Sequence, residues 1–382
     1  MKEHAIVGAR LHDGERYRPG RALVVRGDRI AAIVPEDGLA EGMATTRLDG
    51  GTLAPGFVDL QVNGGAGLML GDACTPDDLE RIADAHARLG ATTILPTLVT
   101  DAPEATPRAV DLVARATERG MRGIAGLHLE GPHIATGKRG AHEAALVRPM
   151  TDEDERALLD AASRVRTLMV TLAPEVVAPE RIGRLADAGI IVSLGHSAAG
   201  RGVAMRAIAA GARGVTHLFN AMSGLGSREP GLVGAALDAP GPRIGLIADG
   251  HHVHPRTIAI ALRAARGSIH LVSDAMAVAG TGADGFTWGG RHIKRDGGRL
   301  TLPDGTLAGA DLDLATAIRT LVTQCDVPAE RAVAMATSVP AAVLGRDDLG
   351  RMAPGLRADL VHLDEASRLR RVWRGGQPME PR

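Results

Sequence analysis

The chain has 382 residues, 45% of them hydrophobic but only 2% aromatic, which fits one large aliphatic core and a modest second domain. Its 44 Lys and Arg residues nearly balance 45 Asp and Glu residues, leaving a net charge of -1. This balance gives no overall field that would recruit nucleic acid or an anionic membrane, so neither is expected as a partner.

Both ends of the chain show short strand-like segments broken by turn residues. They cover residues 5–7, 21–25 and 30–33 near the start and residues 360–363 and 371–373 near the end. This shared pattern predicts one small β-sandwich domain built from residues 1–54 and 347–382. Residues 55–346 would then form the catalytic domain.

Eight short apolar runs, alternating with amphipathic stretches, fill the middle of the chain. The runs cover residues 56–62, 92–99, 124–129, 168–172, 190–194, 214–218, 244–248 and 269–272. Helices are expected at residues 76–89, 104–119, 151–165, 179–188, 201–210 and 255–265. The pattern predicts an α/β fold, a (β/α)8 TIM-like barrel of buried parallel strands. An open doubly wound sheet is the alternative, but no Gly-rich dinucleotide fingerprint follows the first run.

No apolar run approaches the ~20 residues of a membrane-spanning helix. The first residues also lack the apolar segment of a signal peptide, so a cytoplasmic protein is expected. Cys74 and Cys325, the two cysteines, are expected to be reduced packing residues.

Ionisable residues stand at the carboxyl ends of five of the runs, where the chemistry of such a barrel is located. They are Glu130, His196, His217, a histidine of the pair His251-His252, and Asp274. A single strand-end histidine is more often a hydrogen-bonded structural group. Five ionisable groups at one rim are hard to explain by packing, because buried charges must be paired or coordinated.

Glu130, His196 and His217 form a mixed set of oxygen and nitrogen ligands, which suits a divalent metal with an open position for water. Such a metal lowers the pKa of its water towards ~7. Asp274 fits a general base, with a helix cap after the eighth run as the alternative role. Zn²⁺ is the expected metal, and Fe²⁺, Co²⁺ or Mn²⁺ are compatible with the same ligands.

Two features favour one metal per subunit over two. Barrel hydrolases with two metals often use a carboxylated lysine on a strand, but Lys138 and Lys294 lie outside the predicted strands. They also carry His-x-His at the end of the first strand, where this chain has Gln61 and Asn63. Neutral amides are poor ligands for such metals. His128 is expected to pack in the interior beneath Glu130.

A set of motifs, in order along nearly the whole chain, resembles the N-acetylglucosamine-6-phosphate deacetylase family. They are PGFVD from residue 55, QVNGG from 61, LHLEGP from 127, GHS from 195, THLFNAM from 216, REPG from 228, DGHHV from 249, SDA from 273 and GTLAG from 305. Gln61 and Asn63 resemble the branch of this family that holds a single metal.

The resemblance implies hydrolysis of the acetamide of N-acetyl-D-glucosamine 6-phosphate to glucosamine 6-phosphate and acetate. It implies that His252 is catalytic, binding the substrate and polarising the scissile carbonyl, and that His142 contacts the sugar. Asn220 and the backbone of Ala221 would bind the phosphate. Arg228 would reach that phosphate from the neighbouring subunit of a homodimer. Gln61 and Asn63 would belong to the same substrate-binding set.

Two departures from the family leave the substrate open. His133 stands where an aromatic residue is more usual, and residues 277–284 are rich in Gly and Ala. The alternatives are deacetylation of another N-acyl amino sugar or N-acyl amino compound, or a non-catalytic scaffold with the same fold. Arg228 and His142 also have a simpler alternative, as a solvated loop arginine and a structural histidine.

Overall fold

Eight parallel strands form the centre of the computed structural model, which describes residues 3–71 and 73–380. They are β8 (Val58–Val62), β11 (Thr93–Val99), β12 (Leu127–Glu130), β13 (Leu168–Leu172), β14 (Ile191–Leu194), β15 (Gly214–Val215), β16 (Arg243–Leu246) and β17 (Ser268–Leu271). Their order across the sheet follows their order along the chain. The open doubly wound alternative, in which the strand order reverses, is therefore excluded.

The first and last strands of this sheet are joined by backbone hydrogen bonds just beyond their carboxyl ends. The N–H of Asp274 donates to Gln61 O at 3.0 Å, and the N–H of Asn63 donates to Ala275 O at 2.9 Å. Lower in the seam, the Asp59 carboxylate accepts a hydrogen bond from the N–H of Ser273 at 3.1 Å. The sheet thus closes on itself, and the predicted (β/α)8 barrel is confirmed.

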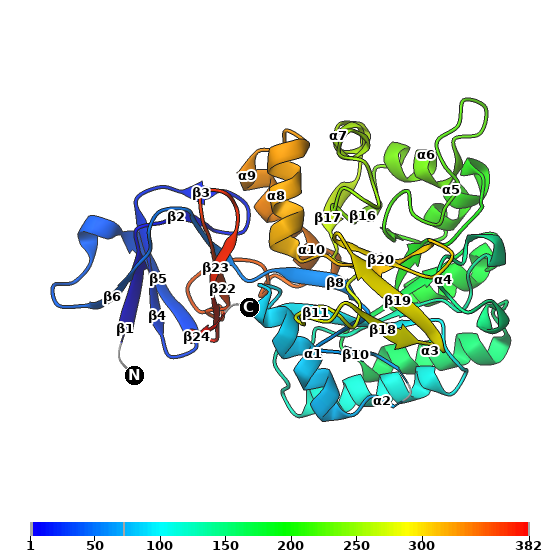
Figure 1. Cartoon of the computed structure of the whole chain (residues 1–382), viewed down its shortest axis with the longest axis horizontal. Helices are drawn as coiled ribbons and strands as arrows, with labels where there is room; N and C mark the ends of the chain where they lie inside the picture. Colours follow the sequence, from blue (N-terminus) through cyan, green and yellow to red (C-terminus); the bar gives the residue numbers. More distant parts are fainter. Residues whose placement is uncertain (1–2, 72, 381–382) are drawn as a thin grey trace.

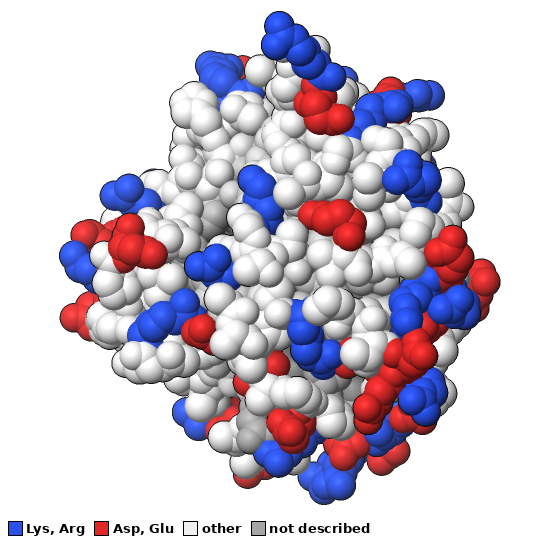
Figure 2. Space-filling model, turned by 90° about the vertical axis from the view of Figure 1, so that its right-hand side faces the viewer, with Lys and Arg blue, Asp and Glu red and all other residues white. Residues whose placement is uncertain are grey.

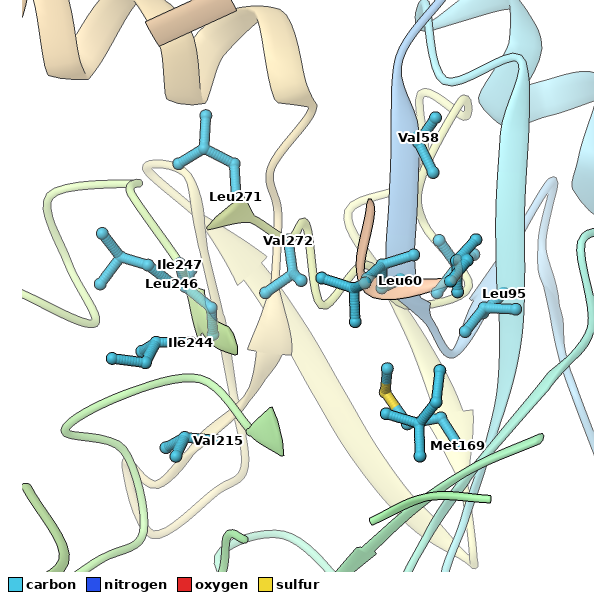
Figure 3. Close-up of a cluster of buried hydrophobic side chains, with 14 of the residues drawn as sticks. Val58, Leu60, Leu95, Met169, Val215, Ile244, Leu246, Ile247, Leu271 and Val272 are labelled. Atoms are coloured by element: carbon cyan, nitrogen blue, oxygen red, sulfur yellow. The ribbon is translucent and has the colours of Figure 1, made fainter. Parts of the chain in front are cut away.

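The barrel core is aliphatic, as the composition predicts. Figure 3 shows side chains of β8, β13, β15, β16 and β17 gathered in one cluster, with Met169 beside Leu60. Every residue of β11 is buried, because helices cover the outside of the strand while other side chains fill the inside. Strands buried on both faces read as continuous apolar runs, which is why all eight could be found in the sequence.

All six predicted helices are present, with their ends moved by about a residue. They are α1 (Pro76–Arg88), α2 (Ala105–Glu118), α3 (Asp152–Arg164), α4 (Pro179–Asp187), α5 (Arg201–Ala209) and α7 (Pro255–Ala264). Thr75 and Thr151 begin α1 and α3 with reciprocal capping boxes. Four further helices were not predicted: α6 (Gly231–Asp238), α8 (Leu314–Gln324), α9 (Ala329–Ala334) and α10 (Ser338–Val343). In α6 the first seven residues are all buried, so no polar stripe marks it as a helix.

Strands from both ends of the chain lie side by side at one end of the molecule (Figure 1). One sheet has the order β5 (Arg29–Pro35), β4 (Arg21–Arg26), β1 (Glu3–Val7) and β6 (Ala44–Arg47). The other has the order β24 (Gln377–Met379), β23 (Leu369–Arg374), β22 (Leu360–Leu363), β7 (Thr52–Pro55), β2 (Arg10–His12) and β3 (Tyr17–Arg18).

The second of these sheets connects the β-sandwich to the barrel through its alternating side chains. Leu360 and Trp373 share a buried cluster with Ile6 of the first sheet. Their neighbours Val361 and Val372 belong to the core of the barrel, because successive residues of a strand face opposite sides. A β-sandwich formed by both termini is thereby confirmed, while the domain limits at residues 54/55 and 346/347 stay a prediction.

A small antiparallel sheet between β17 and α8 was not predicted. It consists of β18 (Gly285–Trp288), β19 (Arg291–Asp296), β20 (Arg299–Thr301) and β21 (Leu307–Ala310), which Figure 1 shows in yellow. Only Ile293 is buried in β19, so the strand gives no apolar run in the sequence. The remaining short elements are β9 (Gly64–Gly65), β10 (Leu68–Met69) and the 3-10 turns Glu36–Gly38, Thr136–Lys138 and Ala144–Leu146.

Positive and negative side chains are interspersed over the face seen in Figure 2, in keeping with the near-zero net charge. Cys74 and Cys325 are both free thiols, as expected. Among the residues that the structure describes, no helix combines the length and the apolarity needed to cross a membrane.

Candidate metal centre and active site

The three predicted metal ligands meet at the carboxyl end of the barrel. Glu130 is the last residue of β12, while His196 and His217 each follow the end of a strand by two residues. The two Nε2 atoms of His196 and His217 lie 3.0 Å apart, and they lie 3.2 and 3.0 Å from Oε1 of Glu130. Ligands of a tetrahedral zinc ion at 2.0–2.1 Å stand about 3.3 Å from one another, so the spacing fits such an ion.

The tautomer of His196 suits metal binding. Its Nδ1 lies 2.8 Å from the carbonyl oxygen of Lys138. Since a carbonyl can only accept, Nδ1 carries the proton, and the lone pair of Nε2 points at Glu130 and His217. A hydrogen bond of this kind on the outer nitrogen is typical of metal-binding histidines.

The charges of the cluster also favour binding of a cation at its centre. Burial alone would raise the pKa of Glu130, but the adjacent imidazoles of His196 and His217 outweigh it and hold that pKa well below its usual range. Burial would likewise lower the pKa of His217, and the Glu130 carboxylate reverses this and raises it. A buried carboxylate that draws positive charge to itself, with two imidazoles beside it, fits a divalent metal.

His142 lies close to this cluster but differs from the other two histidines. One ligand atom each of Glu130, His142 and His196 lies within 4.8 Å of the others, so these residues form an alternative metal group. However, the backbone N–H of Thr100 donates to Nδ1 of His142 at 3.3 Å. The proton of neutral His142 therefore lies on Nε2, which becomes a donor rather than a ligand. Burial, and then the charge of His196, lower the pKa of His142 to about 3 and keep it neutral.

Asp274 is held by the two amides that end the first strand. Its Oδ1 accepts hydrogen bonds from Asn63 Nδ2 at 2.7 Å and from Gln61 Nε2 at 3.0 Å. Burial, and then the negative charge of Glu130, raise the pKa of Asp274 above its ordinary value. The helix-cap alternative is excluded, because the next helix begins only at Leu314, after its own cap at Asp313.

Gln61 and Asn63, which were predicted to bind substrate, form hydrogen bonds with acidic side chains of the site. Besides Asp274, Gln61 Nε2 also donates to Oε1 of Glu130 at 3.0 Å. The amide nitrogen thus fills the space between the two carboxylates. Asn63 lines the cavity described below, whereas Gln61 does not.

The backbone is strained where it delivers the predicted site residues. His196, His217 and Asp274 have φ values of 46°, 30° and 52°, and Phe219 and Ala221 after β15 have 78° and 48°. Non-glycine residues rarely adopt these values, and they gather at functional sites. The same turn explains why β15 ends at Val215 although the apolar run continues to residue 218.

His252 is oriented by Asp249, a residue that the sequence analysis did not single out. Nδ1 of His252 lies 2.6 Å from Oδ2 of Asp249, and both side chains are almost fully buried. Burial would raise the pKa of Asp249, but the hydrogen bond from His252 prevails and lowers it. The aspartate is therefore ionised and fixes the orientation of the imidazole by accepting the hydrogen bond at Nδ1. The spacing of three residues between acid and histidine was the signal that could have revealed the pair.

A cavity of about 340 Å³ opens over these groups. The predicted residues that line it are Asn63, Glu130, His142, His196, His217, Asn220, Ala221, His252 and Asp274. The small sheet β18–β21 and the segment before it add Met276 and Trp288, which were not predicted, and Thr306 and Leu307 of the GTLAG motif, for which no role was predicted. Arg228 lies outside the lining, exposed on a loop, and has no ion-pair partner in the part of the chain that the structure describes.

His128 lies in the barrel interior below Glu130, as expected. Its Nε2 lies 2.8 Å from Thr171 Oγ1 and its Nδ1 lies 3.3 Å from Thr97 Oγ1. Both ring nitrogens are therefore occupied by hydroxyl groups. Burial lowers the pKa of His128 to about 4, so it is neutral and plays no part in the metal cluster.

Comparison with known proteins agrees with this geometry. The Amidohydrolase family matches residues 52–379. The chain is 42% identical to N-acetylgalactosamine-6-phosphate deacetylase of Shewanella sp. (strain ANA-3), over 91% of each chain. It is 34% identical to N-acetylglucosamine-6-phosphate deacetylase of Haemophilus influenzae, over 89% of this chain and 90% of that one.

A solved structure gives the same result in three dimensions. The N-acetylglucosamine-6-phosphate deacetylase from Pasteurella multocida superposes with a TM-score of 0.94, at 32% identity and over 99% of both chains. The chain is therefore a hydrolase of amide bonds that belongs to the amidohydrolase family, in its group of N-acetylhexosamine-6-phosphate deacetylases.

Proposed function

We propose that this chain hydrolyses the acetamide of N-acetyl-D-glucosamine 6-phosphate to D-glucosamine 6-phosphate and acetate, a step of amino-sugar catabolism. The observation that carries the proposal is the convergence of Glu130, His196 and His217 beside the buried carboxylate of Asp274. A scaffold without activity would gain nothing from keeping these charges together in a cavity, because each is costly to bury.

The family implies a divalent metal, and we assign it to Glu130, His196 and His217, with one ion per subunit and Zn²⁺ as its identity. When bound, this metal supplies a Lewis acid for the scissile carbonyl and lowers the pKa of water. Gln61 supports a single metal ion per subunit. Its Nε2–H groups point at the carboxylates of Glu130 and Asp274 and would repel a second cation between them.

Asp274 is the general base and acid of the proposed reaction. Gln61 and Asn63 occupy its Oδ1, which leaves Oδ2 for the reacting water. Oδ2 takes a proton from the water as it attacks the acetamide carbon, and it returns that proton to the leaving nitrogen. The raised pKa of Asp274 brings it closer to neutral pH, where one group can do both.

Two histidines position the acetamide and the sugar. Asp249 accepts a hydrogen bond from Nδ1 of His252, and Nε2 of the same ring, when it carries a proton, can donate to the carbonyl oxygen as negative charge develops on it. His142 offers the proton on its own Nε2 to a hydroxyl group or to the acetamide of the sugar. These donors are already in place before the substrate binds.

We assign the phosphate to the turn after β15. The N–H of Ala221 donates to no protein acceptor in the described part of the chain, and Asn220 lies beside it on the cavity wall. Among the residues of one subunit that the structure describes, Lys138 is the single lysine or arginine in the lining. Arg228, exposed and without an ion-pair partner, is proposed to reach the phosphate of the neighbouring subunit in a homodimer, where its guanidinium can bind a dianion in bidentate fashion.

The test is acetate release from N-acetylglucosamine 6-phosphate by metal-loaded enzyme, with unphosphorylated N-acetylglucosamine as control. We expect release from the phosphorylated sugar, little from the control, and none from either after chelation. Release that survives complete removal of metal would contradict the mechanism. Equal release from both sugars would remove the phosphate site from the proposal.

N-acetylgalactosamine 6-phosphate is the second candidate substrate, because the Shewanella relative at 42% identity carries that name. The two sugars differ only in the orientation of the C4 hydroxyl, so the metal, Asp274 and phosphate assignments hold for both. The kcat/KM values of the two substrates, measured side by side, decide between them. If kcat/KM for N-acetylgalactosamine 6-phosphate is tenfold higher than for N-acetylglucosamine 6-phosphate, the galactosamine derivative is the substrate.

A further inference from the structure

A second polar cavity, of about 470 Å³, lies at the opposite end of the barrel from the metal ligands. Its wall consists of residues that precede or begin strands, together with the last residues of helices. Arg166 precedes β13, Arg213 precedes β15 and Arg243 begins β16. Because β13, β14, β15 and β16 are consecutive neighbours in the sheet, their amino ends form one continuous rim.

Three arginines line this cavity, and its lining holds no carboxylate among the residues that the structure describes. Neither Arg166 nor Arg213 makes a side-chain hydrogen bond or ion pair with the residues that the structure describes. Arg243 donates only to the hydroxyl group of Ser268, at 3.0 Å. The backbones of Arg213 and Arg243 are joined by a hydrogen bond of 2.7 Å from the N–H of Arg243, which fixes these two residues side by side.

Neighbouring groups that could use these positive charges already have partners. Asp348 lies close enough to Arg166 for the charge of the arginine to lower its pKa, but its carboxylate is held on both oxygens by Arg346. The carbonyls at the ends of α4 and α10 are capped by the backbone N–H groups of Gly189 and Gly345. The arginines are therefore not needed to complete either helix end.

We propose that this cavity is a second binding site for a small phosphorylated molecule, separate from the catalytic cavity. The three arginines of the lining can offer planar guanidinium groups to the oxygens of a phosphate dianion, which accept paired N–H donors. The backbone leaves room for it, since a side chain at Gly189, Gly241 or Gly345 would meet no atom within 4 Å. The cavity is larger than the catalytic one of about 340 Å³, so it can hold a sugar phosphate as well as the free ion.

Titration calorimetry of the metal-loaded protein with inorganic phosphate, and separately with glucosamine 6-phosphate, tests the site. The variant Arg166→Ala/Arg213→Ala removes two exposed side chains that make no hydrogen bond or ion pair with the residues that the structure describes. We expect it to lose one of two phosphate-binding events, with affinity at that site falling by at least about tenfold. Stronger binding of the sugar phosphate than of the free ion would identify a metabolite as the ligand.

Two controls separate the second site from the catalytic one and from a general effect of charge. Arg119→Ala/Arg263→Ala changes the net charge by the same amount at two other exposed arginines and should leave both binding events unchanged. Competitive inhibition of acetate release by phosphate reports the catalytic cavity and should be the same in all three proteins. Identical calorimetric titrations of wild type and Arg166→Ala/Arg213→Ala would overturn the proposal, and so would an equal loss in both double variants.

Discussion

The two ends of the barrel hold ionisable residues in opposite ways. At the carboxyl end, Glu130, His217 and Asp274 are buried, joined through hydrogen bonds and attached to a strained backbone at His217 and Asp274. At the amino end, Arg166 and Arg213 are exposed and make no side-chain hydrogen bond in the described chain. Ionisable groups that are buried and held by fixed partners are suited to catalysis, because their orientation and pKa are set in advance. Exposed charges around an open space are suited to binding. Substitutions at the two ends should therefore have different consequences.

The largest effect is expected from Asp274→Asn at the carboxyl end. Loss of the group that carries the proton should lower kcat by about 10²–10⁴. Metal content should stay the same, because Asp274 is not one of the three ligands. Acetate release and metal analysis on the same preparation check both points. A normal kcat in the Asp274→Asn variant would remove Asp274 from the mechanism.

His252→Ala is expected to lower kcat by about 10²–10³, since it removes a donor to the developing oxyanion. Asp249→Asn should cost less, because the imidazole remains but loses the carboxylate that orients it. The double variant should be no worse than His252→Ala alone, as the aspartate acts through the histidine. Additive losses in this double-mutant cycle would show that Asp249 has a separate role.

A smaller effect follows from the protonation of Asp274. Burial and the charge of Glu130 raise its pKa above the ordinary carboxylate value of about 3.9. The ionised carboxylate of Asp274 is the active form. We therefore expect kcat/KM to have its full value at neutral pH and to fall as the pH drops through the raised pKa. A pH profile with stability checked at each point gives the test. Activity that stays level down to about pH 4 would contradict the raised pKa.

Residues at the amino end of the barrel should take no part in catalysis. Arg166→Ala/Arg213→Ala is expected to leave kcat and KM for the acetylated sugar phosphate unchanged within error, measured without added phosphate. Both residues lie at the far end of the barrel from the cavity that holds Asp274. A fall in kcat as large as that of His252→Ala would mean that the two ends are coupled, and the contrast between them would no longer hold.

The barrel and the meeting of Glu130, His196 and His217 at one end of it could be predicted, because both follow from clear patterns in the sequence. Strands buried on both faces read as apolar runs, and Glu130, His196 and His217 stand at or just after the ends of such runs. Trp288 was missed, and Asp249 and Leu307 stood in quoted motifs without a predicted role. The type of an acid does not show which histidine it orients. Strand β18 buries none of its residues, and β21, Leu-Ala-Gly-Ala, has no polar residue to alternate with the apolar ones.

The contacts within the site also could not be predicted from the sequence. Gln61 and Asn63 were expected to bind substrate, but a residue's type does not show which way its amide points. In the structure both amides donate to Asp274. Likewise, the sequence could not separate His142 from a metal ligand. Only the hydrogen bond from the N–H of Thr100 places its proton on Nε2.

The most direct test of the carboxyl-end centre is a titration of metal-free enzyme with Zn²⁺, following acetate release and bound metal together. Activity should rise in proportion to bound metal and reach its plateau at one ion per chain. Glu130→Gln should bind far less metal and stay inactive over the same range. Activity in the metal-free enzyme, or a plateau reached only at two ions per chain, would contradict a single ion held by Glu130, His196 and His217.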